Sequence, residues 1–180
     1  MADRGRDNLW APWRIGFMQT LTHRDTREDP AGCFFCEAAR DTQARDPDPH
    51  LLLHRGAHAV LLMNRYPYVN GHILVAPCRH VADLDDLEPE ECHALMDGLQ
   101  LAARALRRGM NAQGYNVGFN VGRCAGAALP GHVHAHVVPR WHGDTNFMEV
   151  LGGVKVIPQA LEDSYATLLE TVRELLRATP

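Results

Sequence analysis

Histidine occupies alternate positions of the segment 131–141, which reads GHVHAHVVPRW. Side chains of a β-strand alternate between its two faces, so this spacing predicts a strand that places His132, His134 and His136 on one side. The apolar residues between them then face a buried side. Imidazoles are costly to bury without partners, and three in strict alternation argue against a merely solvated sheet face. The pattern therefore predicts a β-sheet protein with a chemical site on this strand.

The remaining patterns predict an α+β domain. Strands are expected at 58–63, 72–76 and 115–121 from their apolar residues and flanking turn residues. Amphipathic helices are expected at 88–110, where Pro89 suits the first turn, and at 158–178. Short connections between the strands favour an antiparallel sheet, with one long helix between strand pairs and a helix at the C-terminus.

Composition narrows the class of function. The 180 residues carry a net charge of -4, which gives no electrostatic footprint for polymeric nucleic acid or an anionic membrane. No apolar run approaches the ~20 residues of a transmembrane helix, and the N-terminus lacks the apolar stretch of a signal peptide. Five cysteines, an odd number, argue against a disulfide framework. We therefore expect a cytoplasmic protein without membrane association.

Two kinds of chemistry suit the histidine row. Two histidines two positions apart can bind one metal ion, but His132 and His136 lie roughly 13 Å apart along a strand, so a single ion does not collect all three. The alternative is phosphoryl transfer. Neutral imidazole is a nucleophile near pH 7, and its attack on phosphorus forms a phosphoramidate that an acceptor then opens. At least one histidine therefore has a role other than metal binding.

A CxxC pair, Cys33 and Cys36, offers a separate metal site. A redox pair is expected at a helix N-terminus in a βαβ unit, whereas this pair follows a turn, which favours zinc over redox chemistry. Two histidines from elsewhere would complete a Cys₂His₂ tetrahedron. His54 and His58 are candidates from the residues alone. Reduced cysteines without a metal are the remaining interpretation.

The segment 132–138 resembles the histidine triad family, whose pattern His-φ-His-φ-His-φ-φ, with φ apolar, it matches at every position. The segments 64–68 and 71–72 look like that family's nucleoside-binding strand and loop. The segments 139–147 and 9–14 are similar to its bacterial branch of diadenosine tetraphosphate phosphorylases and adenylyltransferase-like proteins. The resemblance covers nearly the whole chain and implies a HIT-like fold.

The resemblance also implies roles for individual residues. His134 would be the nucleophile, His136 would contact the transferred phosphate and assist the leaving group, and His132 and His72 would orient the site. The implied zinc ligands, which match those of many family members, are Cys33, Cys36, His80 and His132. The implied nucleotide-binding residues are Asn64 at the ribose, Asn120 at the phosphate, Gly126 in the glycine-rich loop, and Asn146 and Trp141 at the distal phosphates or leaving nucleotide.

One departure from the family lies just before the triad. Family members commonly carry Ser or Gln there to bind the phosphate, whereas this chain has Ala127 and Ala128 after Gly126. Backbone N–H groups of the loop would have to substitute. The expected function is a nucleotidyl hydrolase or transferase that cleaves adenosine nucleotide phosphoanhydrides, such as diadenosine tetraphosphate, or phosphoramidates. The alternatives are a nucleotide-binding or sensing protein with little turnover, and a mononuclear metalloenzyme using His132 and His134.

The expected organisation has three parts. Residues 1–32 form an N-terminal arm, 33–150 a HIT domain with the zinc site, and 151–180 a C-terminal helical extension. No organic cofactor is expected. The resemblance implies a homodimer, and the arm, with its two tryptophans, could extend it to a tetramer. The expected partner is an adenosine nucleotide or dinucleoside polyphosphate substrate.

Overall fold

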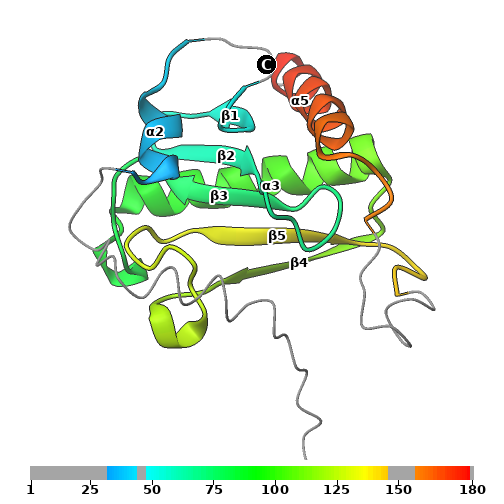
Figure 1. Ribbon diagram of the computed structural model, residues 1–180. Helices are drawn as coiled ribbons and strands as arrows, with labels where there is room; N and C mark the ends of the chain where they lie inside the picture. The colour runs from blue at the N-terminus through cyan, green and yellow to red at the C-terminus, as the bar shows by residue number, and fades with distance from the viewer. Residues whose placement is uncertain (1–31, 44–47, 146–156, 179–180) are drawn as a thin grey trace, which may run out of the picture.

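The fold is a five-stranded antiparallel sheet with helices on both faces, seen in a computed structural model that describes residues 32–43, 48–145 and 157–178 (Figure 1). The strands run in the order β1-β2-β3-β5-β4. Their bounds are Leu52–Arg55 (β1), Ala59–Met63 (β2), Ile73–Pro77 (β3), Gly114–Phe119 (β4) and Ala135–Arg140 (β5). The α-helices are Phe34–Arg40 (α2), Pro89–Met110 (α3) and Leu161–Arg177 (α5), with 3-10 turns at Leu84–Asp86 (η1) and Arg123–Ala125 (η2). The predicted α+β class is confirmed.

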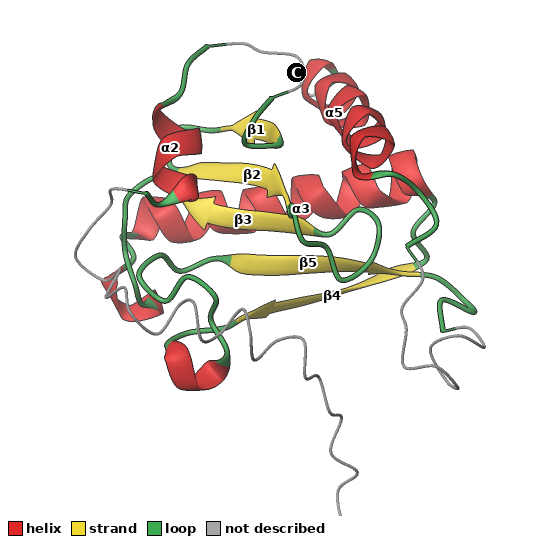
Figure 2. Cartoon of the chain, viewed as in Figure 1, coloured by secondary structure: helices red, strands yellow, loops and turns green. Residues whose placement is uncertain are grey.

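The two faces of the sheet bury different layers, as the alternation of side chains requires (Figure 2). Leu61 and Val75 face the long helix α3, whereas Val60 and Leu74 face the short helix α2. Helix α5 packs against α3 and β1 and closes the layer on the α3 side. The strand β4 lies at the edge of the sheet and, among the described strands, pairs only with β5.

The long helix begins and ends where the sequence predicts. Glu88 caps its N-terminus in a capping box with Glu91, and Pro89 occupies the first turn, where it loses no hydrogen bond. At the other end Asn111 adopts a left-handed conformation with φ 52, and the chain turns into β4. At Gly98 the helix approaches the sheet so closely that a Cβ would lie 2.7 Å from Val75 Cγ1.

Three features differ from the sequence prediction. Helix α2 and strand β1 were not expected, and the histidine strand is shorter than predicted. Strand β5 starts at Ala135, so only His136 of the triad lies within it. Before that point the chain leaves the ladder, because the N–H of Val133 donates to the carbonyl of Val81 in the loop after β3. The histidines nevertheless remain neighbours, since the ring centroids of His134 and His136 are 5.0 Å apart.

None of the helices in the described ranges is both long and apolar enough to cross a membrane. The residues 1–31, 44–47, 146–156 and 179–180 lie outside the description, and with them Asn146, the tryptophan-bearing segment 9–14 and nearly all of the predicted arm.

Candidate functional site

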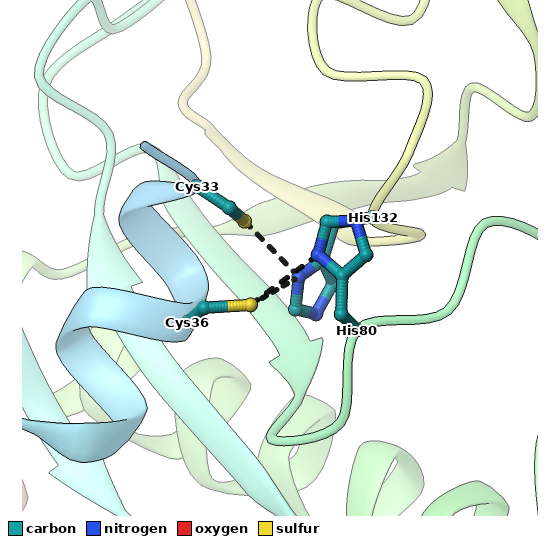
Figure 3. A group of neighbouring side chains, drawn as sticks. All are labelled: Cys33, Cys36, His80 and His132. Atoms are coloured by element: carbon teal, nitrogen blue, oxygen red, sulfur yellow. Dashed lines mark hydrogen bonds between the residues drawn. The ribbon is translucent and has the colours of Figure 1, made fainter. Parts of the chain in front are cut away.

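Two cysteines and two histidines converge beside the N-terminal end of α2, and all but His80 are buried (Figure 3). The Nδ1 atom of His132 lies 3.2 Å from Cys33 Sγ and 3.6 Å from Cys36 Sγ. The Nδ1 atom of His80 lies 3.3 Å from Cys36 Sγ. All four ligand atoms lie within 4.8 Å of one another, so the predicted set Cys33, Cys36, His80 and His132 comes together.

This cluster fits a tetrahedral zinc ion. Zn–S bonds of about 2.3 Å and Zn–N bonds of about 2.1 Å place sulfur and nitrogen ligands roughly 3.6 Å apart, which is close to the separations observed. The Nε2–H of His132 donates to the Pro77 carbonyl at 2.9 Å, which leaves Nδ1 unprotonated and turned to the cysteines. Burial raises the pKa of Cys33 to about 12, so an incoming metal ion must displace the thiol proton.

Helix α2 corrects one step of the sequence reasoning. Cys33 is the N-cap of α2, so the CxxC pair does lie at a helix N-terminus, contrary to the premise that favoured metal over redox chemistry. The interpretation as a metal site now depends on other observations. The sheet is antiparallel rather than part of a βαβ unit, and two imidazoles complete the cluster.

The loop after β3 carries His80 and is fixed to the start of α3 by an ion pair. Arg79 donates to the two carboxylate oxygens of Glu91, from Nε at 3.0 Å and from Nη2 at 2.6 Å. The Glu88 N–H donates to the same carboxylate at 2.9 Å. Burial alone would raise the pKa of Glu91, but these hydrogen bonds outweigh it and the pKa is lowered. Sequence analysis missed this pair, because Arg79 and Glu91 are 12 positions apart in different elements and no local spacing links them.

The middle histidine presents a free ring nitrogen. The Nδ1–H of His134 donates to the backbone carbonyl of His132 at 2.8 Å. A carbonyl only accepts, so Nδ1 carries the proton and Nε2 keeps its lone pair. Burial lowers the pKa of His134, which keeps the ring neutral. A neutral imidazole with a bare Nε2 is the form that a nucleophile requires.

His136 and His72 are linked through their ring nitrogens. His72 Nε2 lies 3.1 Å from His136 Nδ1, and the backbone N–H of Tyr68 donates to the other nitrogen of His72, Nδ1, at 3.2 Å. An N–H of the backbone can only donate, so the His72 proton sits on Nε2 and is donated to His136. Burial lowers the pKa of His72 to about 3, helped by the repulsion that His136 or His134 would exert if protonated, so His72 stays neutral.

This arrangement makes His136 a hydrogen-bond donor at the site. Because its Nδ1 accepts from His72, neutral His136 carries its own proton on Nε2. That atom lies 3.4 Å from the amide end of the Asn120 carboxamide, and because two donors cannot bond to each other, Asn120 has to turn its oxygen to the His136 Nε2–H to accept from it. The predicted pair His136 and Asn120 is therefore together in one site. Asn64, the predicted ribose-binding residue, lies next to His72, with its Nδ2 3.2 Å from His72 Nδ1.

Aromatic rings line the histidine cluster on two sides. Tyr68, missed by the sequence analysis although it lies in the segment that resembles the nucleoside-binding loop, has its ring centroid 4.7 Å from His72 and 6.0 Å from His136. Phe35 of α2 is fully buried, with ring centroids 4.9 Å from His134 and 5.1 Å from His132. Because α2 also supplies two cysteines, one helix holds both the metal cluster and the wall of the triad.

Some backbone N–H groups of the glycine-rich loop before the triad form hydrogen bonds within the loop itself. The Gly126 N–H donates to the Arg123 carbonyl and the Ala127 N–H to the Gly122 carbonyl. Gly126 itself adopts φ 86, which favours glycine. Gly126 would therefore let the backbone approach a bound phosphate closely, but its own N–H would not donate to that phosphate.

Trp141 lies at the far end of β5 from the triad. Its indole N–H donates to the Met110 carbonyl at 3.1 Å, at the end of α3. It lines a cavity of about 530 Å³ whose lining, among the described residues, includes none of the triad histidines. Within one chain the structure thus brings Trp141 to the C-terminal end of α3 and does not bring it together with His134 and His136.

Comparison with known proteins agrees with this site. A model of the HIT domain family matches residues 47–143, a span that contains the three triad histidines, His72 and His80 but neither Cys33 nor Cys36. The fold, the triad geometry and this match define a histidine triad protein, and the chain belongs to the HIT family.

Two relatives are informative by name. The chain is 38% identical over 169 residues to a Mycobacterium tuberculosis protein named AP-4-A phosphorylase, covering 90% of this chain and 85% of the relative. It is 32% identical over 93 residues, 52% of this chain and 50% of the relative, to the asymmetrical bis(5'-nucleosyl)-tetraphosphatase of Schizosaccharomyces pombe. A crystal structure described as a Zn-bound histidine triad family protein from Mycobacterium smegmatis is 30% identical, with a TM-score of 0.64, covering 82% of this chain and 98% of that chain.

Proposed function

We propose that this protein is an enzyme that cleaves adenosine nucleotide phosphoanhydrides, such as diadenosine tetraphosphate, or phosphoramidates, at the α-phosphorus through a covalent nucleotidyl-His134 intermediate. The observation that carries the proposal is the hydrogen bond from His134 Nδ1 to the His132 carbonyl at 2.8 Å, since it leaves Nε2 unprotonated. The two relatives, named as a phosphorylase of AP-4-A and a tetraphosphatase, support the choice of substrate.

In the first step His134 Nε2 attacks the α-phosphorus. A P–N bond forms, the P–O bond to the leaving nucleotide breaks, and the electron pair of that bond stays on the leaving phosphate. His136 donates its Nε2–H to a phosphoryl oxygen where negative charge develops, and Asn120 lies beside it. A polyphosphate leaving group carries its charge on oxygen and needs no proton at that moment.

In the second step an acceptor oxygen attacks the nucleotidyl-His134 and restores the free imidazole. Water yields a nucleoside monophosphate, and inorganic phosphate yields a diphosphate. Ala127 and Ala128 offer no side-chain donor where the family commonly has Ser or Gln. The similarity to a protein named as a phosphorylase supports inorganic phosphate as the acceptor.

The four-residue cluster would hold a structural zinc ion. A set of four protein ligands leaves no open position for substrate, and His134 is not part of the set. Zinc would join α2 to the loop after β3 and to the start of the triad segment. This assignment supports a division of labour in which His132 binds metal while His134 and His136 contact the nucleotide.

We also propose that two copies of the chain assemble through β4. This strand has one unpaired edge among the described strands, and Val117 on it is 46% exposed. An exposed strand edge is a template for pairing with a second chain. Sedimentation of the purified protein tests this, and a monomer at micromolar concentration would contradict it.

The decisive experiment is product analysis with diadenosine tetraphosphate. Phosphorolysis releases ADP and ATP only when phosphate is present, whereas hydrolysis releases AMP and ATP without it. Mass spectrometry of protein trapped during turnover should show a nucleotidyl adduct that His134→Asn lacks. Full turnover by His134→Asn, with no adduct in the unmodified protein, would refute the mechanism. Tight nucleotide binding without turnover would favour the sensing alternative, which the alanines at 127 and 128 motivate.

A further inference from the structure

The side chain of Asn64 bridges its own loop and His72. Asn64 follows β2, and its Oδ1 accepts the backbone N–H of Tyr66 at 2.9 Å. That contact identifies the oxygen end of the carboxamide, because a backbone N–H can only donate. The amide end, Nδ2, therefore faces His72 Nδ1 at 3.2 Å and acts as a donor there.

His72 thus receives two donors on one nitrogen. The Tyr68 N–H and the Asn64 Nδ2–H both point at Nδ1, so that atom keeps its lone pair and the single ring proton sits on Nε2. His72 is fully buried, so no water competes for these atoms. Its Nε2–H then donates to His136 Nδ1 at 3.1 Å, which in turn places the His136 proton on Nε2. This assignment requires that Asn120, 3.4 Å from His136 Nε2, turn its carboxamide oxygen to that atom.

The geometry points to Asn64 as a positioning residue that fixes the tautomer of His72 and thereby directs the His136 proton toward the transferred phosphate. This inference rests on the proposed function, since it assumes that His136 donates to the phosphate. It differs from the ribose-binding role that the family resemblance implies for Asn64. Under that role the carboxamide acts on the substrate directly and makes no demand on the histidine tautomers.

The two roles predict opposite orders for two substitutions. A carboxylate at position 64 accepts hydrogen bonds from two ribose hydroxyls. A ribose role therefore predicts that Asn64→Asp is more active than Asn64→Ala. In the tautomer role Asn64→Asp places an acceptor against the lone pair of His72 Nδ1 and draws a proton to that atom. Asn64→Ala removes one donor and leaves the Tyr68 N–H in place. The tautomer role therefore predicts that Asn64→Ala is more active than Asn64→Asp.

The test measures kcat and KM with diadenosine tetraphosphate. We expect Asn64→Asp to lose about 100-fold in kcat, the share of rate that a positioned proton donor supplies, with KM within about threefold. Asn64→Ala should lose about tenfold or less. The control Gln100→Glu adds the same charge at an exposed position of α3 and should leave both constants unchanged.

Histidine tautomers are read independently of activity by NMR of protein labelled with ¹⁵N in its histidines, with the His72 signals assigned from His72→Asn. The unmodified protein should show His72 protonated on Nε2 alone, and Asn64→Asp should show a proton on Nδ1. A raised KM, with Asn64→Ala less active than Asn64→Asp, would overturn the inference. So would protonation of His72 on Nδ1 in the unmodified protein, a result that needs no variant. Absence of turnover and adduct in the unmodified protein would instead refute the proposed function.

Discussion

The carboxylate of Glu91 offers a sharp test of how the metal cluster is held. It receives three hydrogen bonds, two from Arg79 and one from the Glu88 N–H, and it is 5% exposed. Glu91→Gln preserves the shape but removes the charge and one acceptor oxygen. Buried hydrogen bonds to a charged group contribute about 1.5–3 kcal/mol each, but the Arg79 side chain is 46% exposed, so water screens its share. We expect the free energy of unfolding to fall by about 2 kcal/mol.

The same substitution should weaken zinc binding, because Arg79 directly precedes the ligand His80. Loss of a group that orients a metal ligand typically costs tenfold or more in affinity. We expect about a tenfold rise in the dissociation constant, measured by competition with a chromophoric chelator, and about 1.4 kcal/mol less stabilisation by zinc.

The control for this experiment is Glu90→Gln, which removes a neighbouring but exposed carboxylate from the same helical turn. It should change neither quantity. Urea unfolding is measured with zinc and with chelator for both variants. If Glu91→Gln loses stability equally in both conditions and binds zinc as the unmodified protein does, the ion pair serves the helix terminus alone and the reasoning about His80 is wrong.

Four further outcomes are expected. Gly98→Ala should lower the free energy of unfolding, measured in urea, by about 1 kcal/mol. Overpacking of the new Cβ against Val75 Cγ1 at 2.7 Å costs about 1–3 kcal/mol, whereas the higher helix propensity of alanine contributes at most about 1 kcal/mol. A more stable variant would contradict this. Chelation of zinc should lower the melting temperature, and an unchanged value would show that the cluster binds no structural metal. His134→Asn should bind nucleotide but form no adduct, in contrast to the unmodified protein. Unfolded His72 binds a proton near pH 6.5, whereas burial lowers its pKa in the folded protein to about 3. His72 should therefore contribute about 1.6 kcal/mol to a fall in stability from pH 6.5 to pH 5, and His72→Asn should remove that share of the slope.

Local patterns were sufficient for the long elements. The helix 88–110 is marked at its start by Pro89 and the acidic first turn, and the structure ends it at Met110 as expected. The strand prediction at 58–63 differs from β2 by one residue at its start, and the prediction at 72–76 is shifted by one residue relative to β3. Such elements are specified by periodicity and caps within a dozen residues, which a single sequence displays.

Short elements were missed because their stability comes from tertiary packing. Helix α2 has seven residues, too few to be stable alone, and it exists because Phe35 and Ala38 are fully buried against β2 and β3. Strand β1 has four residues, too few for a periodic signal. The missed helix mattered for function, since it reversed the premise about where the CxxC pair lies.

The predicted metal ligands illustrate a different limit. Cys33 and His132 are separated by 99 positions, and spacing alone left His54 and His58 open as alternatives. Only the resemblance to the histidine triad family singled out His80 and His132. The structure brings these two to the cysteines, because the loop after β3 carries His80, and the segment before β5 carries His132, to the N-terminal end of α2 (Figure 3).

The differences among the three histidines arise from partners that the sequence does not display. His132 donates from Nε2 to the Pro77 carbonyl, His134 donates from Nδ1 to the His132 carbonyl, and His136 accepts at Nδ1 from His72. In the proposed mechanism each contact leaves the opposite nitrogen available: a bare Nδ1 on His132 for metal, a bare Nε2 on His134 for attack, and a protonated Nε2 on His136 for donation. Strand alternation predicts that the rings share a face but gives no tautomer, since a tautomer depends on one hydrogen bond to the second nitrogen. Both contacts of His132 lie before Ala135, where the chain has left the ladder and the Val133 N–H bonds to Val81. In the proposed mechanism the tautomers therefore depend on contacts that strand alternation does not specify.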